Sequence, residues 1–215
     1  MGLVLYEFRE SKWETIMPVL GAVVLAAGKS ERMGINKFLL PWGNELAGGR
    51  ILRILHLAGF SEIILVLGFD KDNIQSSLGS VIEMLGVKIV FNPHHEKGML
   101  SSVKAGVREL REDIDGFFVV LGDQPFLKVE WLERLQGVFS PSDTLILTPV
   151  FRGEMGHPVL FNSRLREEIL SLEDEKDTLR TLLARCSPLI LRVDFSDEEI
   201  LWDIDTPEEL ERRRI

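Results

Sequence analysis

A short apolar run near the start of the chain leads into a glycine-containing stretch that carries several cations. Residues 24–37 read Val-Leu-Ala-Ala-Gly-Lys-Ser-Glu-Arg-Met-Gly-Ile-Asn-Lys. The cations are Lys29, Arg32 and Lys37. Gly28 and Gly34 allow the backbone to bend closely around a ligand, and consecutive amide groups in such a loop form a concave anion site. Because the whole chain has a net charge of -9, this local positive charge predicts a cradle for an anion such as a triphosphate.

Two common phosphate-binding loops do not fit this stretch. Ala27-Gly28-Lys29-Ser30 resembles the end of a P-loop, but the first glycine of that motif would stand at position 23, which is Val23. The dinucleotide-binding pattern GxGxxG fails as well, because Gly28 and Gly34 are six residues apart. An ordinary strand-to-loop junction with solvated basic residues is the alternative interpretation.

Acidic residues in two distant segments are candidates for a metal site. Residues 117–121 form an apolar run that ends in Gly122-Asp123-Gln124-Pro125, and Asp203 and Asp205 precede a helix start at Thr206. Ligands of open α/β sheets bind outside the carboxyl ends of strands, so Asp123 is expected to face the site. Mg²⁺ prefers a few carboxylates together with water and substrate phosphates. Each segment alone is equally compatible with a local turn.

Composition limits the class of protein. A chain of 215 residues with 45% hydrophobic and 27% charged residues is most simply one globular domain, here 18–215, preceded by an extension, 1–17, of unknown role. The acidic balance disfavours nucleic acid and anionic membranes as partners. Cys186 is the only cysteine, which excludes an intrachain disulfide. No apolar run is long enough for a membrane span, so a cytoplasmic location is expected.

Apolar runs alternate with helical patterns along the chain, which is typical of βαβ units and a mostly parallel sheet. The pattern predicts a three-layer α/β sandwich. Strands are expected at 21–26, 62–67, 87–91, 117–121, 144–149, 157–161 and 189–193. The clearest helix is 99–111, with Lys104, Arg108 and Arg111 on its polar faces. A last helix is expected from Thr206, where Glu209 completes a capping box.

Motifs from across the chain together resemble one enzyme family. They are the loop Leu-Ala-Ala-Gly-x-Ser-x-Arg-Met-Gly-x-x-Lys, Asn92-Pro93 with Gly98-Met99-x-Ser101-Ser102, Gly122-Asp123-Gln124-Pro125, Gly156-His157-Pro158 and Asp203-Ile204-Asp205-Thr206-Pro207. This set is similar to that of the molybdenum cofactor cytidylyl- and guanylyltransferases. The resemblance implies a Rossmann-like three-layer α/β/α sandwich of the nucleotide-diphospho-sugar transferase type.

The resemblance also implies roles for the matched residues. Arg32 would hold the β and γ phosphates, Lys37 would lie at the α phosphate, and both would be catalytic together with Asp123. Asp123 and one of Asp203 and Asp205 would hold Mg²⁺. Gln124 and His157 would face the acceptor. The implied nucleotide-binding residues are Leu25, Ala26, Ala27, Gly28, Lys29, Ser30, Arg32, Met33, Gly34, Lys37, Gly68, Asn92, Gly98, Ser101, Ser102 and Asp123.

The implied reaction transfers CMP from CTP to the phosphate of molybdopterin or molybdenum cofactor and releases pyrophosphate. Segments 43–49 and 173–180 depart from the family pattern, so several alternatives stay open. These are GMP transfer to the same cofactor, transfer to a sugar phosphate or another phosphorylated alcohol, and a non-catalytic nucleotide-binding module. The substrates implied are CTP or GTP and a molybdopterin-type acceptor, with a molybdoenzyme or chaperone as protein partner. His94 and His95 have no zinc-site spacing and are expected in a solvated loop.

Overall fold

A computed structural model describes residues 17–30, 33–174, 176–206, 209 and 211–212. Three features predicted from the sequence therefore lie wholly or mostly outside the described residues. They are the extension 1–17 apart from Met17, the catalytic candidate Arg32, and much of the last helix after Thr206.

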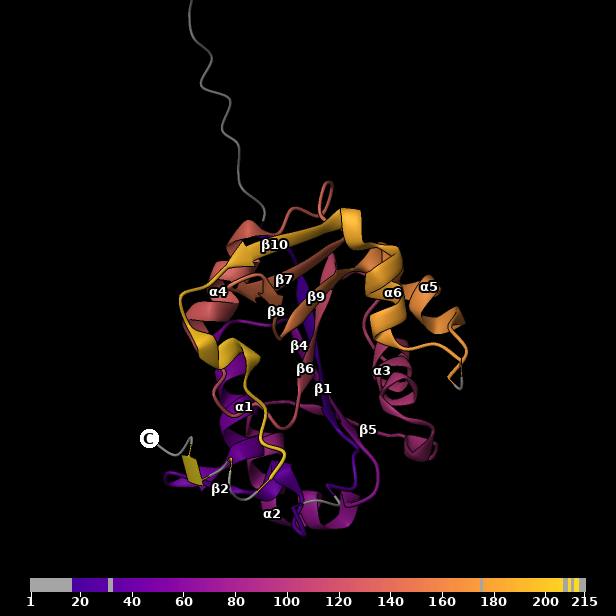
Figure 1. Ribbon diagram of the computed structural model, residues 1–215. Helices are drawn as coiled ribbons and strands as arrows, with labels where there is room; N and C mark the ends of the chain where they lie inside the picture. The colour runs from indigo at the N-terminus through magenta and orange to yellow at the C-terminus, as the bar shows by residue number, and fades with distance from the viewer. Residues whose placement is uncertain (1–16, 31–32, 175, 207–208, 210, 213–215) are drawn as a thin grey trace, which may run out of the picture.

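The centre of the molecule is an eight-stranded sheet in the order β10-β7-β9-β6-β1-β4-β5, with β8 paired to β7 (Figure 1). Its strands are β1 (Leu20–Ala26), β4 (Glu62–Leu67), β5 (Lys88–Phe91), β6 (Gly116–Leu121), β7 (Ile146–Phe151), β8 (Glu154–Met155), β9 (Val159–Asn162) and β10 (Ile190–Asp194). Strands β1, β4, β5 and β6 run parallel to one another, and β10 runs parallel to β7. A separate hairpin joins β2 (Pro41–Trp42) to β3 (Glu45–Leu46).

Strand β9 is antiparallel to both of its neighbours, β6 and β7. Only residues 152–158 separate β7 from β9. A parallel return needs a crossover of a dozen or more residues, so this connection can build only an antiparallel pair. The sheet is therefore mixed but mostly parallel, and the predicted fold class is confirmed.

Helices cover both faces of the sheet (Figure 1). One face is covered by α1 (Ala47–Leu57), α2 (Lys71–Met84) and α4 (Val129–Val138), and the other by α3 (Met99–Arg108), α5 (Arg166–Ser171) and α6 (Leu179–Arg185). The described chain also contains the 3-10 helices η1 (Lys37–Leu39), η2 (His95–Lys97), η3 (Ser163–Leu165), η4 (Ser187–Leu189) and η5 (Glu198–Leu201).

The central strand β1 shows how its sequence fills both layers of core. Successive side chains of a strand point to opposite faces. Ala22 and Val24 pack into the cluster that includes α1, α2 and α4, whereas Val23 packs into the cluster with α3. All three are fully buried. A continuous apolar run is thus the expected sequence of a strand with helices on both sides.

The seven strands predicted from the sequence all exist, with shifts of one or two residues at most ends. Strands β2, β3 and β8 were not predicted, because each has two residues and gives no periodic pattern. Helix α3 ends at Arg108, three residues before its predicted end. The chain turns there toward β4, and the backbone N–H of Arg111 donates to the Glu62 carboxylate at 2.7 Å.

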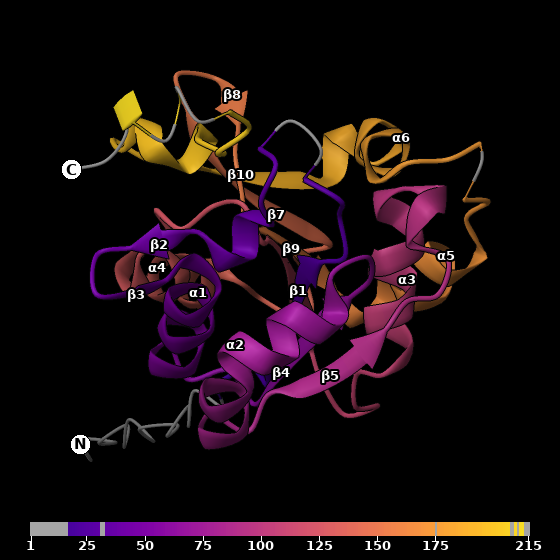
Figure 2. The same ribbon diagram turned by 90° about the horizontal axis from the view of Figure 1, so that it is seen from below.

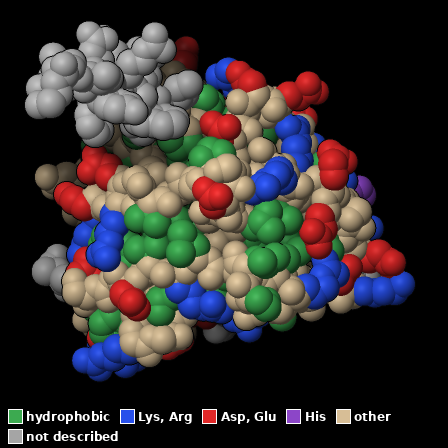
Figure 3. All heavy atoms as spheres, turned by 90° about the horizontal axis from the view of Figure 1, so that it is seen from above, with side chains coloured by type: hydrophobic (Ala, Val, Ile, Leu, Met, Phe, Trp, Pro, Cys, Tyr) green, Lys and Arg blue, Asp and Glu red, His purple; other side chains and the backbone are tan. Residues whose placement is uncertain are grey.

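The carboxyl ends of the parallel strands meet at one edge of the sheet, which Figure 2 shows from below. Helices α1 and α2 lie on one side of the sheet together with the segment that follows β10, and α3, α5 and α6 lie on the other. On the opposite end of the molecule, acidic and basic side chains intersperse around separate apolar patches (Figure 3). Among the described residues, every helix is too short or too polar to cross a bilayer.

Candidate functional site

The stretch from Gly28 to Lys37, called the basic loop below, is held by contacts within itself. Ser30 adopts a left-handed conformation with φ 51°, and its carbonyl accepts a hydrogen bond from the Met33 N–H at 3.0 Å. Its hydroxyl accepts from the Lys37 N–H at 3.2 Å. Asn36 Oδ1 accepts from the Phe38 N–H at 3.0 Å and caps η1. These contacts place Lys37 at the first position of η1.

The structure brings Lys37 together with Asp123 and Asp205. The ammonium lies 3.2 Å from Oδ2 of Asp123 and also forms a close ion pair with Oδ1 of Asp205. Burial alone would lower the pKa of Lys37, but hydrogen bonds to Asp205 and Asp123 and their charges raise it above the ordinary value. Lys37 is therefore a firmly charged cation between two carboxylates.

The segment 202–206, called the C-terminal segment below, is bound to the strand end that carries Asp123. The N–H of Ile204 donates to the carbonyl of Asp123 at 3.1 Å, and the Ile204 side chain is fully buried. The carboxylate of Glu209 accepts from the N–H groups of Asp205 at 2.7 Å and Thr206 at 3.1 Å. The Thr206 hydroxyl accepts in turn from the Glu209 N–H at 3.3 Å, which confirms the predicted capping box.

Three aromatic rings from segments next to these carboxylates pack together. The ring of Phe126 meets Trp42 edge-on at 5.0 Å between centroids and meets Trp202 in the same way at 5.3 Å. Met33 and Ile204 belong to the same apolar cluster. The basic loop, the strand end and the C-terminal segment therefore share one small core, which fixes Lys37 and Asp205 relative to each other.

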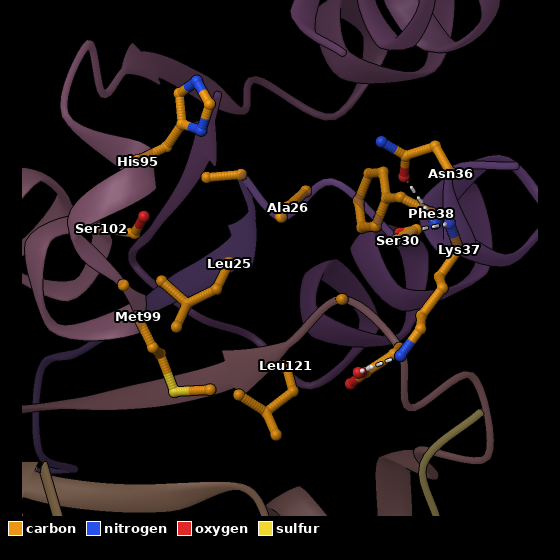
Figure 4. A pocket seen from close by; sticks show the side chains of 15 residues that line it. Leu25, Ala26, Ser30, Asn36, Lys37, Phe38, His95, Met99, Ser102 and Leu121 are labelled. Carbon is orange, nitrogen blue, oxygen red and sulfur yellow. Dashed lines mark hydrogen bonds and ion pairs between the residues drawn. The ribbon is translucent and has the colours of Figure 1, made fainter. Parts of the chain in front are cut away.

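A cavity of about 290 Å³, called the first cavity, opens beside this ion-pair cluster (Figure 4). That volume is just below the usual range for small-molecule pockets, about 300–1,000 Å³. The predicted nucleotide-binding residues that line it are Leu25, Ala26, Ala27, Gly28, Ser30, Lys37, Gly98, Ser102 and Asp123. Most come from the ends of β1 and β6 and the start of α3, as expected for an open α/β sheet.

Other predicted nucleotide-binding residues lie elsewhere. Lys29 and Gly34 line a second cavity of about 450 Å³ between the basic loop and α2. Met33 is buried in the aromatic cluster. Gly68, Asn92 and Ser101 do not line the first cavity. Asn92 and Ser101 use their polar groups in hydrogen bonds within the protein.

The two predicted acceptor residues lie outside the first cavity. Gln124 is half-buried in the turn after β6, where its carbonyl accepts from the Leu127 N–H at 3.4 Å. The backbone N–H of His157 donates to the carbonyl of Ile200 at 3.1 Å. Its Nδ1 is buried without a hydrogen-bond partner among the described residues.

The pKa values of His157 and Asp203 are both shifted in the direction that favours the neutral form. Burial lowers the pKa of His157 to about 4, with the charge of Asp203 raising it and that of Arg180 lowering it further. Burial raises the pKa of Asp203, and the neighbouring charges of Asp123 and Asp205 raise it further. Perturbed pKa values of partly or fully buried groups are common at functional sites.

The first cavity is also lined by residues that were not among the predicted nucleotide-binding residues. They are Asn36, Phe38, His95, Met99, Leu121 and Gly122. Leu121 and Gly122 directly precede Asp123, so their position at a strand end was a usable signal. The loop with His94 and His95 was expected to be solvated. His94 is exposed as expected, but His95 is half-buried and lines the first cavity.

The carboxylates at the site suit a hard divalent cation. Oδ1 of Asp123 is buried and lacks a hydrogen-bond partner among the described residues, so it offers a lone pair to a ligand. Carboxylate oxygens are the donors that Mg²⁺ and Mn²⁺ prefer. Within the described ranges, no three acidic, histidine or cysteine side chains form a preassembled metal site. Water and substrate phosphates would have to supply the remaining ligands.

Comparison with known proteins places this geometry in a family. The chain is 29% identical to the molybdenum cofactor cytidylyltransferase of Escherichia coli, covering 90% of this chain and 94% of the relative. It is also 29% identical to purine catabolism protein PucB of Bacillus subtilis, covering 92% of this chain and 97% of that protein.

Solved structures agree with the sequence comparison. Rv0371c of Mycobacterium tuberculosis superposes with a TM-score of 0.77 at 27% identity, covering 91% of this chain and 96% of that one. The same protein has been solved in complex with manganese, with a TM-score of 0.73 at 25% identity, 91% coverage of this chain and 97% of that one. Residues 22–189, well over half of the chain, match the MobA-like NTP transferase domain, and the protein belongs to that family of nucleotidyltransferases.

Proposed function

We propose that this protein transfers CMP from CTP to the phosphate of molybdopterin or molybdenum cofactor and releases pyrophosphate. The observation that carries the proposal is the cluster of Lys37, Asp123 and Asp205 at one end of the first cavity. The similarity to a molybdenum cofactor cytidylyltransferase over 90% of the chain supports the choice of CTP and acceptor.

The ammonium of Lys37 would offset the negative charge that develops on the α phosphate. Its raised pKa keeps it charged throughout the physiological pH range. In phosphoryl-type transfer the protein forms few or no covalent bonds with the substrate, so most of the rate enhancement is expected to come from positioning and charge compensation. Arg32 keeps its proposed role at the β and γ phosphates, on the basis of the sequence alone.

We assign a divalent cation, Mg²⁺, to Asp123 together with Asp205 or Asp203. The unpartnered Oδ1 of Asp123 is the donor that supports this assignment. When bound, the cation would neutralise triphosphate charge and stabilise the departing pyrophosphate. The protein's own part is to hold the carboxylates in place through the C-terminal segment, whose Ile204 N–H is bound to the carbonyl of Asp123.

The acceptor would approach from the side of Gln124 and His157, outside the nucleotide cavity. The buried, neutral imidazole of His157 carries a polar nitrogen that lacks a partner in the described protein. Because buried polar atoms are normally hydrogen-bonded, a ligand that binds this nitrogen would make a favourable contact. This supports an acceptor position next to Asp203.

Pyrophosphate release tests the proposal. The protein would be incubated with Mg²⁺ and each of CTP, GTP and ATP, with and without the pterin cofactor. A panel of sugar phosphates would replace the pterin in a parallel set. The expected result is release with CTP that depends on the pterin. Release with none of the nucleotides would contradict the proposal, and release that depends on a sugar phosphate would reassign the acceptor.

The variant Asp123→Asn separates a catalyst from a nucleotide-binding module. A catalyst is expected to lose turnover by on the order of 100-fold or more, with a smaller change in nucleotide affinity. Asp72→Asn, on the exposed surface of α2, removes the same charge outside the site and serves as the control. Equal turnover in both variants would exclude a role for Asp123 in the reaction.

A further inference from the structure

The loop between β5 and α3 is braced from inside the protein. Asn92 is 3% exposed, and its Nδ2 donates to the hydroxyls of Ser101 at 2.9 Å and Ser102 at 3.0 Å. Its Oδ1 accepts from the N–H of His94 at 3.0 Å. The hydroxyl of Ser101 contacts the carbonyls of His94 at 2.9 Å and Gly98 at 2.8 Å. Asn92 and Ser101 therefore fix the loop that contains His95.

The end of β4 leaves space for His95. A Cβ atom added to Gly68 would lie 2.8 Å from the Cβ of His95 and 2.6 Å from the carbonyl oxygen of Ala27. The ring of Phe69 lies 6.4 Å from the imidazole between centroids and is inclined by 68° to it. Gly68 thus permits the approach of His95, and Phe69 supports its ring from one side.

These contacts place a polar ring at the first cavity, away from the ion-pair cluster. In Figure 4, His95 and Ser102 lie on one side of Leu25, and Lys37 and Ser30 lie on the other. Among the described residues, neither imidazole nitrogen of His95 has a hydrogen-bond partner, and the ring is in contact with Phe69. The adjacent His94 is exposed and lies outside both described cavities.

We infer that His95 recognises the nucleobase of the bound nucleotide through its imidazole, an inference that rests on the proposed function. The phosphates belong at Lys37, so the opposite end of the cavity receives the nucleoside. A neutral imidazole presents one N–H donor and one nitrogen acceptor, a set that can pair with the polar edge of a base. A base with the wrong edge would leave one of these groups unpaired, which is how hydrogen-bonding sites discriminate strongly between similar ligands.

Nucleotide affinity, measured without acceptor, tests this role. Titration calorimetry would give dissociation constants for CTP, GTP, UTP and ATP with Mg²⁺ in the wild type, His95→Phe, His95→Asn and His94→Phe. His95→Phe keeps a ring against Phe69 but removes both polar nitrogens. This variant is expected to raise the dissociation constant of the preferred nucleotide by about tenfold or more. The ratio of its affinity to that of the other nucleotides is expected to fall by the same factor.

The other two variants control for hydrogen bonding and for the position of the change. His95→Asn restores one donor and one acceptor, so it is expected to recover part of the preference. His94→Phe changes the neighbouring exposed ring and is expected to keep wild-type constants. Thermal unfolding of each variant would confirm that it is folded. A wild-type preference in His95→Phe, or the same loss in His94→Phe, would overturn the inference.

The outcomes also separate this inference from the proposed function. Selective nucleotide binding that depends on His95, without pyrophosphate release on any acceptor, would support His95 and refute the transferase proposal. If His95→Phe still released pyrophosphate with the nucleotide selectivity of the wild type, the transferase proposal would be supported and the role of His95 refuted. A wild-type protein that binds none of the nucleotides would refute both.

Discussion

The ammonium of Lys37 lies 3.2 Å from the carboxylate of Asp123, although 86 residues separate them along the chain. One comes from the end of the basic loop and the other from the end of β6, and Asp205 completes the cluster from the far end of the chain. Oppositely charged groups in a partly buried site stabilise one another's charged forms. The three side chains therefore act as one electrostatic unit, and changing one of them disturbs the others.

Replacing Lys37 with Gln is expected to lower turnover by on the order of 100-fold or more, because the positive charge at the α phosphate is lost. The remaining carboxylates would repel each other and the triphosphate, so nucleotide affinity is expected to fall as well. Initial rates of pyrophosphate release at saturating nucleotide check the first effect. Lys88→Gln, which breaks an exposed ion pair with Glu109, is the control and should keep wild-type rates. Retained turnover in Lys37→Gln would remove this residue from the mechanism.

His157 is expected to make stability depend on pH. Burial lowers its pKa from 6.5 to about 4, so between those values the unfolded chain binds more protons than the folded protein. The neutral, buried His157 therefore contributes fully to the free energy of unfolding above pH 6.5. As the pH falls toward 4 this contribution is lost, by about 3 kcal/mol at most. Urea unfolding of the wild type and of His157→Asn, from pH 7.5 down to 4.5, checks this. The difference between the two curves should shrink as the pH falls, and a constant difference would contradict the prediction.

Periodicity and composition were enough to predict the fold. Apolar runs such as residues 117–121 could be assigned as strands because helices bury them on both faces. The antiparallel direction of β9 depends on the length of its connection and not on its own residues. Lys104 shows a further limit of pattern reading. It was placed on a polar face of its helix, but it is 8% exposed and binds the carbonyl of Leu172 at 2.7 Å, because residues 172–174 fold over that face.

Some residues of the candidate site could be predicted from the sequence and others could not. Asp123 could be predicted because it is an acidic residue at the end of an apolar strand, and Lys37 because it is one of several cations in a glycine-containing loop. Asn92 and Ser101 were expected to meet the nucleotide, but they use their polar groups to brace a loop, and His95 occupies the cavity wall instead. Which member of a polar loop points inward depends on hydrogen bonds between its residues, which a linear pattern does not reveal.

The contact between Trp202 and Phe126 is expected to position the acidic C-terminal segment. Trp202→Ala would remove an edge-on aromatic contact at 5.3 Å and loosen the segment that carries Asp205. Because Trp202 is half-buried, a loss of about 1–2 kcal/mol in unfolding free energy is expected, below the 3–5 kcal/mol typical of a fully buried aromatic ring.

Kinetics distinguish positioning from simple destabilisation in this variant. Turnover should fall more than nucleotide affinity, since the carboxylates move while the cavity walls stay. Trp202→Phe keeps an aromatic ring and should recover most of the turnover. If Trp202→Ala lost stability but kept its turnover at a temperature where it is folded, the contact would be structural only.

Gly68→Ala is expected to destabilise the protein and to disturb nucleotide binding together. The added methyl group would lie 2.6 Å from the backbone oxygen of Ala27 and 2.8 Å from the Cβ of His95, so backbone must move to admit it. Overpacking of this kind typically costs about 1–3 kcal/mol. Gly79→Ala, within α2, is the matched control, because nothing lies within 4 Å of its added Cβ and alanine favours a helix by about 1 kcal/mol. Chemical denaturation should therefore move the two midpoints in opposite directions, and only Gly68→Ala should weaken nucleotide binding. Equal shifts of the two denaturation midpoints would mean that the close approach of the end of β4 to the His95 loop does not affect stability.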